Sequence, residues 1–444
     1  DGGIYDQLGG GFCRYAVDAE WMIPHFEKML YDNGALLAVY ADAALASGDA
    51  FYARVVLETA AWTLREMLAE SGGYCSSLDA DSEGHEGRFY VWDREKVRAV
   101  LTADEFAVFA PRFGLDGSAN FEGHWHLYVA APIDQLAKQS GRPPAAVEAL
   151  IASASAKLLK VRERRVRPAR DDKILASWNA LMIRGMARAA RALGRDEFAQ
   201  SAGRALGFIR STLWRDGRLL ATSMDGRAHL DAYLDDYVFL VDALLELQQV
   251  RFRSDELGFA QELLEVVLEH FPDPVAGGFY FTADDHEALI QRPKSFADDA
   301  TPSGNGIAAL VLQRMGYLLG EPRYLAAAER TLRAAWLPLE RYPQAHVSLL
   351  NALEEHLNPP EIVILRGAAE AIDTWRRNLA ALYAPRRLVL AIPAEASGLP
   401  PALAEKTPRA HTVAYICRGS TCSAPLESFE ALAAELRTGG ERRH

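Results

Sequence analysis

One pattern recurs along the chain: a long helical segment, a short loop, and a second helical segment that begins beside an acidic residue. The second segments start with SGDAFYARV, GRDEFAQSA, RSDELGFAQ and GEPRYLAAA, at residues 47–55, 194–202, 253–261 and 320–328. Glycine-plus-aromatic or glycine-plus-leucine turns follow at 72–81, 216–226 and 277–285, and predict short hairpins or extended loops. A single helical hairpin cannot bury both its apolar faces, so the recurrence predicts hairpins that pack against one another.

The helices that precede these segments also carry apolar residues at helical spacing, such as Leu37 with Tyr40 and Leu181 with Met182. Polar residues gather where these first helices are expected to begin, at 25–33, 171–173, 231–237 and 301–305. In an (α/α) toroid the inner helices line a ring, and such ends meet at one mouth. We therefore predict a mainly α fold, a closed (α/α) toroid. An α-solenoid is the alternative.

An insertion and an appendage interrupt the helical pattern. Residues 76–165 contain aromatic segments that favour strands, so we expect a β-rich, lid-like insertion there. After Pro360 the sequence predicts strands at 361–365, 386–393 and 412–417, and helices at 368–383 and up to Arg437. The predicted domains are thus the toroid over 1–358 and a small α/β domain over 361–444.

Composition limits the classes of partner. The formal net charge of -12 argues against general nucleic-acid binding, and the one basic run, at 160–170, is interpreted as a solvated helix end and loop. No apolar run is long enough to cross a bilayer, so no membrane partner is expected.

The cysteines indicate the cellular location of the chain, and its first residue indicates whether it is part of a longer protein. Four cysteines do not form a secreted disulfide framework, which favours a cytoplasmic location. Cys417 and Cys422 are expected to be two separate thiols, with a redox pair as the alternative. Because the chain begins at Asp1 without a methionine, we expect it to be a fragment of a longer protein.

The segment from Gly9 to Asn33, GGGFCRYAVDAEWMIPHFEKMLYDN, concentrates more chemistry than a surface helix needs. Its glycines allow close backbone approach, its aromatic rings offer stacking faces, and a histidine with carboxylates moves protons near neutral pH. A glycine turn followed by an ordinary amphipathic helix is the simpler interpretation.

No metal or cofactor is predicted. Asp79, Asp81 and Glu83 resemble the start of a calcium loop, but its twelfth position is Tyr90 rather than glutamate. His124 and His126 alternate along an expected strand without a third ligand at suitable spacing. The run Gly9 to Gly11 matches neither phosphate-loop pattern.

Several longer motifs point to a family. They are GGIYDQLGGGF (2–12), PHFEKMLYDN (24–33), LDADSEGHEGRFYVW (78–92), NFEG (120–123), RPARDDKILASWNALM (167–182), LDDYVFL (234–240), RPKSFADDATPSGN (292–305) and the C-terminal AYIC with Cys422. With these motifs the chain resembles the thioredoxin-domain-containing proteins typified by bacterial YyaL and spermatogenesis-associated protein 20.

The resemblance implies a thioredoxin-like domain upstream of Asp1 and an (α/α)6-type toroid similar to N-acylglucosamine 2-epimerases and six-hairpin glycosidases. It also implies that the first toroid helices lie upstream of Asp1, which would leave the ring incomplete at its N-terminus. The chain departs from the family at three places: Cys13 stands where relatives often carry histidine, and Asn179-Ala180 and Asp298-Asp299 replace commoner pairs that end in glycine.

Two kinds of function follow. In the first, the toroid binds and processes a carbohydrate-like small molecule: epimerisation would use His25 with Glu27, whereas hydrolysis would use two carboxylates from Asp172, Asp235 and Asp236. In the second, the toroid is a non-catalytic scaffold that binds a ligand or a partner. The predicted substrate-binding residues, which would hold anionic groups, stack on rings or donate hydrogen bonds, are Arg14, Tyr15, Asp18, Trp21, Lys28, Tyr31, Asp81, Trp178, Asn179, Tyr237, Arg292, Lys294 and Asn305.

Overall fold

The computed structural model describes residues 2–287 and 290–441. The chain forms two compact units, which are described separately below. The first unit comprises Asp1–Asn33, Arg54–Glu70 and Tyr74–Lys173, and the second comprises Gly34–Ala53, Ser71–Gly73 and Ile174–His444. None of the described helices has the length and apolar character that a membrane span requires.

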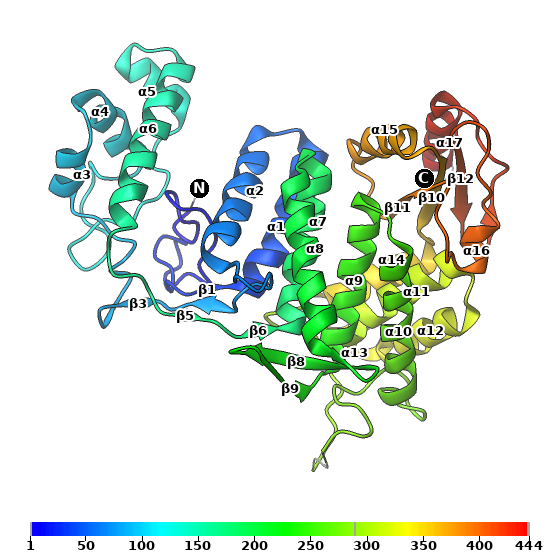
Figure 1. Cartoon of the computed structure of the whole chain (residues 1–444). Helices are drawn as coiled ribbons and strands as arrows, with labels where there is room; N and C mark the ends of the chain where they lie inside the picture. The colour runs from blue at the N-terminus through cyan, green and yellow to red at the C-terminus, as the bar shows by residue number, and fades with distance from the viewer. Residues whose placement is uncertain (1, 288–289, 442–444) are drawn as a thin grey trace. The chain divides into compact units, whose positions relative to one another are not determined.

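Four helical hairpins follow one another along the chain (Figure 1). They are α1 (Leu30–Ser47) with α2 (Ala50–Trp62), α7 (Ala176–Leu193) with α8 (Asp196–Phe208), α9 (Leu234–Val250) with α10 (Ser254–His270), and α11 (Gly304–Leu319) with α12 (Pro322–Ala334). Gly194 and Gly320, with φ of 64° and 67°, end α7 and α11 in the left-handed conformation that glycine adopts easily. All four second helices begin within the segments that the sequence pattern predicted.

The first helices of successive hairpins pack side by side in the second unit. Helix α7 packs on α9, α9 on α11, and α11 on α14 (Val347–Leu357). Gly34 of α1 lies against α7, because a Cβ there would come within 2.7 Å of the Met182 nitrogen. Nearly every residue of α9 and α11 is buried, whereas the inner helices of an open solenoid would expose one face. The unit therefore has the predicted (α/α) toroid class of fold.

A short turn precedes each first helix. Isolated bridges close three of these turns, between Tyr5 and Phe12, Leu68 and Tyr74, and Pro272 and Phe279. The pairing of β7 with β8 closes the fourth, between Trp214 and Leu219. Strands β7 (Trp214–Arg215), β8 (Arg218–Met224) and β9 (Arg227–Asp231) confirm the hairpin predicted at 216–226, and β6 (Ile174–Leu175) also pairs with β8. The described part of 277–285 has no strand, so there the turn continues as an extended loop.

The insertion is mainly helical, which corrects the expected β-rich structure. It contains α3 (Arg94–Val100), α4 (Ala103–Arg112), α5 (Ile133–Ser140) and α6 (Pro144–Arg162). Its strands are two residues long: β2 (Ser77–Leu78) lies between β1 (Lys28–Met29) and β5 (Arg170–Asp171), and β3 (Asp81–Ser82) pairs with β4 (His85–Glu86). Trp92, in one of the aromatic segments that suggested strands, forms an isolated bridge with Trp125 and packs with Phe109 in a core beneath the helices. His124 lies in an isolated bridge and not on the expected strand.

The C-terminal part forms the predicted α/β structure. Strands β11 (Arg387–Pro393), β10 (Glu361–Gly367), β12 (Val413–Arg418) and β13 (Thr421–Cys422) form a sheet in that order, with β10 parallel to β11 and antiparallel to β12. Helices α15 (Ala369–Ala380) and α17 (Phe429–Glu441) pack with it, and a short helix, α16 (Pro401–Ala404), precedes β12.

The expectation of two separate thiols in this sheet is wrong. Cys417 and Cys422 form a disulfide. The pairing of β12 with β13 places the two residues directly opposite each other, a proximity that sequence spacing alone did not reveal.

Candidate functional site

A histidine flanked by two carboxylates lies just before α1 in the first unit. Nδ1 of His25 is 2.7 Å from Oε1 of Glu86, and its Nε2 is 3.4 Å from Oε2 of Glu27. The ring stacks on Tyr15, with 5.1 Å between centroids. The His25 side chain is 27 % exposed, so solutes reach it. Glu86 comes from the β3–β4 hairpin, which is why the sequence pattern around His25 did not reveal it.

Arg14, Tyr31 and Asp32 extend this group. Arg14 Nη1 is 3.5 Å from Oε2 of Glu27, and interaction with Tyr31 raises the pKa of Arg14. Burial raises the pKa of Asp32 to about 6; Arg14 opposes this shift and Glu27 adds to it. Oδ2 of Asp32 is buried and accepts no hydrogen bond from the described residues. We call these side chains the α1-start cluster: Arg14, Tyr15, His25, Glu27, Tyr31, Asp32 and Glu86.

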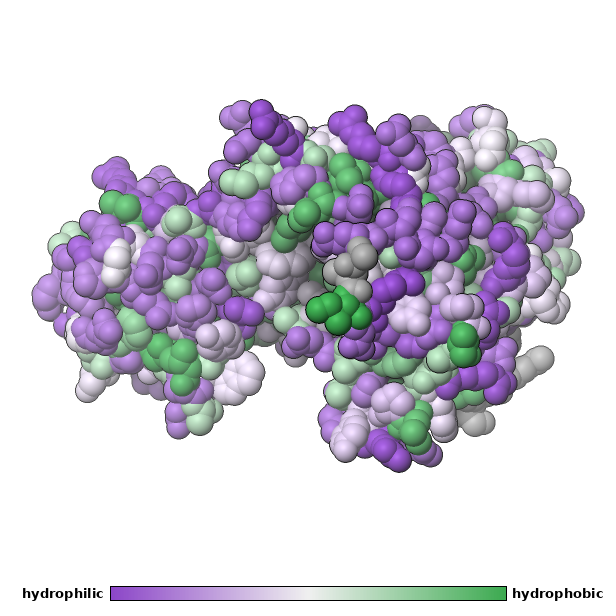
Figure 2. Space-filling view, turned by 90° about the horizontal axis from the view of Figure 1, so that it is seen from below, coloured by the Kyte–Doolittle hydropathy of each residue, from purple (hydrophilic) through white to green (hydrophobic). Residues whose placement is uncertain are grey.

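An open cleft of about 910 Å³ lies beside this cluster in the first unit, and Glu86 lines it. On the same cleft, Nδ1 of His124 is 2.9 Å from Oδ1 of Asp93, which also pairs with Lys96 at 2.5 Å. Sequence reasoning missed this arrangement, because Asp93 and His124 are far apart in the chain and no motif connects them. Figure 2 shows hydrophilic residues over most of one face of the molecule, interrupted by small hydrophobic groups.

Asp18 and Trp21 shape the loop that leads to His25. The Asp18 carboxylate accepts hydrogen bonds from the backbone nitrogens of Glu20, Met22 and Ile23. Those bonds, the one from Ile23 foremost, lower its pKa. Trp21 has φ of 58° and is 61 % exposed, so its ring is open to solvent. Asp18 is thus engaged in the turn, whereas Trp21 is accessible to a ligand.

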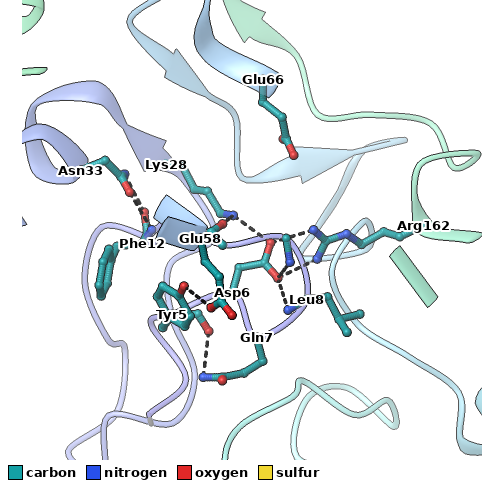
Figure 3. Close-up of polar contacts among 12 residues, drawn as sticks. Tyr5, Asp6, Gln7, Leu8, Phe12, Lys28, Asn33, Glu58, Glu66 and Arg162 are labelled. Atoms are coloured by element: carbon teal, nitrogen blue, oxygen red, sulfur yellow. Dashed lines mark hydrogen bonds and ion pairs between the residues drawn. The ribbon is translucent and has the colours of Figure 1, made fainter. Parts of the chain in front are cut away.

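Lys28 is occupied by a buried ion pair (Figure 3). Its Nζ lies 2.9 Å from Oδ2 of Asp6 and donates to the Gly10 carbonyl oxygen at 2.8 Å. Arg162 donates to both oxygens of the same carboxylate at 2.8 Å. Burial alone would raise the pKa of Asp6, but Arg162 and Lys28 hold it well below its usual value. Arg162 is only 2 % exposed, so the interpretation of the basic run as fully solvated is wrong at this residue.

The second unit contains a second copy of this arrangement. Nζ of Lys294 is 2.6 Å from Oδ2 of Asp273 and donates to the Gly277 carbonyl oxygen at 3.0 Å. As Asp6 does with Leu8 and Gly9, Asp273 accepts from the two backbone nitrogens at 275 and 276. Both lysines therefore hold glycine turns, and their ammonium groups are already paired with carboxylates.

A buried asparagine belongs to each of these two lysine–aspartate arrangements. Asn33 accepts from the Phe12 nitrogen at 2.7 Å and donates to the Phe12 oxygen at 3.0 Å. Asn305 makes the same two bonds with Phe279, at 2.8 and 2.9 Å. Asn179 donates to the Leu175 oxygen near the start of α7. These amides fix backbone at the helix starts.

Two adjacent carboxyls lie at the start of α9 in the second unit. Asp236 accepts from the backbone nitrogens of Ser177, at 2.8 Å, and Tyr233, at 2.9 Å, so it caps both α7 and α9. Asp235 packs against Gly304 at the start of α11, where a Cβ would meet its Oδ1 at 2.0 Å. Burial raises the pKa of Asp235 to about 7, with a contribution from Asp236, and raises that of Asp236 to about 6.

The remaining predicted residues differ in how available they are. Tyr237 is fully buried, and its hydroxyl accepts from the Leu219 nitrogen at 2.9 Å. Arg292 donates to the Thr282 oxygen and lies over the Tyr280 ring. Trp178 is half-buried.

Asp172 and Asp81, both in the first unit, are exposed. Asp172 lies 2.5 Å from Nε of Arg170, whose hydrogen bond lowers its pKa.

The structure thus divides the predicted site residues between the two units. The first unit holds Arg14, Tyr15, Asp18, Trp21, His25, Glu27, Lys28, Tyr31, Asp81 and Asp172. The second unit holds Trp178, Asn179, Asp235, Asp236, Tyr237, Arg292, Lys294 and Asn305.

Comparisons with known proteins gave close relatives by sequence. No family model matches the chain. Human spermatogenesis-associated protein 20 is 29% identical over 96% of this chain and 60% of its own length. The uncharacterized protein B0495.5 of Caenorhabditis elegans is 28% identical over 97% of this chain and 64% of its own length. The chain therefore spans less than two thirds of these relatives, and the predicted upstream thioredoxin-like domain stays a prediction.

Solved structures show weaker likeness. A sugar epimerase from a ruminal bacterium has a TM-score of 0.48 at 13% identity, covering 75% of this chain and 66% of that chain. Cellobiose 2-epimerase from Bacillus thermoamylovorans has a TM-score of 0.44 at 10% identity, covering 83% and 69%. We draw no functional conclusion from likeness at this level. The sequence relatives match nearly the whole chain, and by sequence the chain is similar to spermatogenesis-associated protein 20.

Proposed function

We propose that the α1-start cluster binds a carbohydrate-like ligand and that His25 transfers a proton next to its carbonyl group, as an epimerase or isomerase requires. One observation carries this proposal: the partly exposed His25 ring lies between the carboxylates of Glu86 and Glu27. A carboxylate that accepts the proton of one ring nitrogen fixes the tautomer and makes the other nitrogen a better base. The cleft beside Glu86 offers room for a sugar.

The neighbouring side chains suit the other steps of such a reaction. Removing a proton beside a carbonyl leaves negative charge on oxygen, which a guanidinium such as that of Arg14 stabilises. Returning the proton to the opposite face needs an acid with a pKa near neutrality, and Asp32, at about 6, meets this requirement. The exposed ring of Trp21 is a stacking surface for the ligand.

Proton exchange tests the proposal directly. Reducing mono- and disaccharides, amino sugars and uronic acids are incubated with the protein in D2O, and NMR follows deuterium incorporation at the carbon beside the carbonyl. We expect exchange for at least one sugar, reduced about 100-fold or more in His25→Gln, the scale on which general acid–base groups act. Glu86→Gln should cause a smaller loss, because it removes only the group that orients the ring.

His124→Gln is the matched control, since this histidine lines the same cleft but pairs with Asp93. It should exchange at the wild-type rate. Exchange that persists in His25→Gln contradicts the catalytic role of His25. Saturable sugar binding without exchange or hydrolysis would support the non-catalytic scaffold. If the protein neither binds a sugar nor catalyses exchange or hydrolysis, the carbohydrate proposal is refuted.

Glycoside hydrolysis is a second candidate, and the raised pKa of Asp235 favours it. A general acid must hold its proton near neutral pH, and a carboxyl with pKa about 7 does so. Asp172 fits that role poorly, because Arg170 lowers its pKa. Release of sugar from aryl glycosides that is lost in Asp235→Asn but kept in His25→Gln would favour hydrolysis over epimerisation. We also keep the proposal that the protein acts in the cytoplasm.

A further inference from the structure

The disulfide of the C-terminal sheet joins residues of very different exposure. Cys417 lies within β12 and is only 7 % exposed, whereas Cys422 lies on β13 and is exposed. Strand β13 is the last strand of the sheet and pairs only with β12, so one of its sides faces no other strand. A thiol in solution therefore reaches the bond from the side of Cys422.

The other two cysteines, unlike Cys422, are buried and form no disulfide. Cys13 and Cys75 are both buried and are free thiols. Burial raises the pKa of Cys13 to about 12 and that of Cys75 to about 11. Thiols that are buried and protonated react slowly with disulfides and oxidants. The described chain thus has one disulfide with an exposed cysteine, Cys422, and its two free thiols are buried.

We propose that Cys417 and Cys422 form a thiol–disulfide exchange site whose co-substrate is an external dithiol. The thiolate of the dithiol attacks Sγ of Cys422, which forms a mixed disulfide and releases Cys417 as a thiolate that takes up a proton. The second thiol of the dithiol, as a thiolate, then attacks the dithiol's first sulfur, which is bonded to Cys422 in the mixed disulfide. This closes the disulfide of the co-substrate and releases Cys422 as a thiolate that takes up a proton. Two electrons and two protons pass to the protein, and the dithiol becomes a disulfide.

The hairpin that carries the disulfide has other contacts that keep its structure when the disulfide is reduced. Ser423 donates from its nitrogen to the Ile416 oxygen at 2.8 Å, and its hydroxyl accepts from the Ile416 nitrogen at 3.1 Å. Ala414 and Leu426 exchange a further pair of backbone bonds, at 2.9 and 2.8 Å. Arg418 is held by the carboxylate of Glu361 at 2.8 Å. Because these contacts hold both sides of the turn without the sulfurs, reduction leaves the strands in register and the disulfide reforms.

Thiol labelling on the folded chain tests the site. The protein is equilibrated with mixtures of reduced and oxidised dithiothreitol, quenched with acid, alkylated and analysed by peptide mass spectrometry, while circular dichroism follows the fold. We expect Cys417 and Cys422 to gain label together as the mixture becomes more reducing and to lose it on reoxidation. Cys13 and Cys75 should stay unlabelled, and the circular dichroism should not change.

Two single variants test the order of attack. In Cys417→Ser the remaining Cys422 should form a mixed disulfide with oxidised glutathione, about 10-fold or more faster than Cys417 does in Cys422→Ser. Equal rates would overturn the assignment of Cys422 as the attacked sulfur. The whole proposal is wrong if the bond opens only when the fold is lost, or if both cysteines are fully labelled without any reductant.

Discussion

Two neighbouring aspartates show how local contacts separate the roles of identical side chains. Asp236 accepts backbone hydrogen bonds from Ser177 and Tyr233, so its carboxylate holds two helix starts together. Asp235 has no such partner among the hydrogen bonds of the described residues and lies against Gly304. Its pKa rises from 3.8 to about 7, mainly because it is buried. Asp235 therefore changes its charge at a higher pH than Asp236, whose pKa is about 6.

Asp235→Asn should stabilise the protein at pH 8 but not at pH 4. A carboxyl whose pKa is raised by folding favours the folded state while it is protonated, below about 4, and this contribution is lost as the pH rises through about 7. Each pKa unit corresponds to about 1.4 kcal/mol, so the gain at pH 8 should be roughly 2–4 kcal/mol. Urea unfolding at pH 4, 6 and 8 measures it.

Asp236→Asn is the comparison at the neighbouring position. An amide retains one acceptor oxygen but cannot accept both of the bonds that the carboxylate accepts. Burial also raises the pKa of Asp236, to about 6, so removing its charge offsets part of this loss at pH 8. We therefore expect Asp236→Asn to be about 1–2 kcal/mol less stable than Asp235→Asn at pH 8. If Asp235→Asn gained no stability over the wild type at pH 8, Asp235 would have a structural partner and its raised pKa would be in doubt.

At single residues, sequence reasoning identified the chemical groups but not their partners. Lys28 and Lys294 were predicted to hold a ligand, and the ion pair of each with an aspartate about twenty residues earlier, which shapes a glycine turn, was not predicted. Asp32 and Glu86 were not predicted as site residues. Asp32 stands in the same motif as His25, so its place in the first turn of α1 could have indicated it, but Glu86 comes from a hairpin that no local pattern connects to His25.

At the scale of elements, the helix starts are fixed by a repeated set of contacts from aspartate, lysine and asparagine. Asn305 is 2 % exposed and bonds to both backbone groups of Phe279 and to the Ser295 oxygen. Asn305→Ala leaves the two buried backbone groups of Phe279 without partners, so it should lower the free energy of unfolding by about 2–4 kcal/mol. Guanidinium unfolding measures the loss, and Asn351→Ala, at an exposed position of α14, should change it by less than about 0.5 kcal/mol.

The helices were predictable because apolar spacing and capping residues act locally. The second helices α2, α8, α10 and α12 begin where acids and aromatic residues had indicated. The insertion was predicted wrongly because aromatic residues favour both strands and cores. Trp92 is 1 % exposed and packs with Phe109 beneath helices, and composition alone does not distinguish this packing from strand pairing.

At the scale of the whole molecule, buried charges join the inner helices of the second unit. Arg188 of α7 contacts Asp42 of α1 at 2.5 Å and Glu246 of α9 at 2.7 Å. Arg314 of α11 contacts Glu355 of α14 at 2.6 Å. This network was not predicted, because arginines on an otherwise apolar helix face resemble solvent-exposed residues until the neighbouring helices are placed. The network links inner helices that are distant in sequence.

Removing one charge from this network should therefore be costly. Glu246 is 2 % exposed, and although burial opposes its ionisation, Arg188 and Arg191 lower its pKa well below the usual value. Glu246→Gln leaves both guanidinium groups without their full partner, so unfolding at pH 7 should become easier by about 3–5 kcal/mol. Glu329→Gln, in an exposed pair with Arg333, should cost less than about 0.5 kcal/mol. The Glu246 carboxylate adds to the free energy of unfolding above its pKa in the unfolded chain, and this addition is lost as the pH falls. The difference in free energy of unfolding between wild type and Glu246→Gln should therefore become smaller from pH 5 to pH 3. A difference that stayed constant over this range would mean that Glu246 acts through packing and not through its charge.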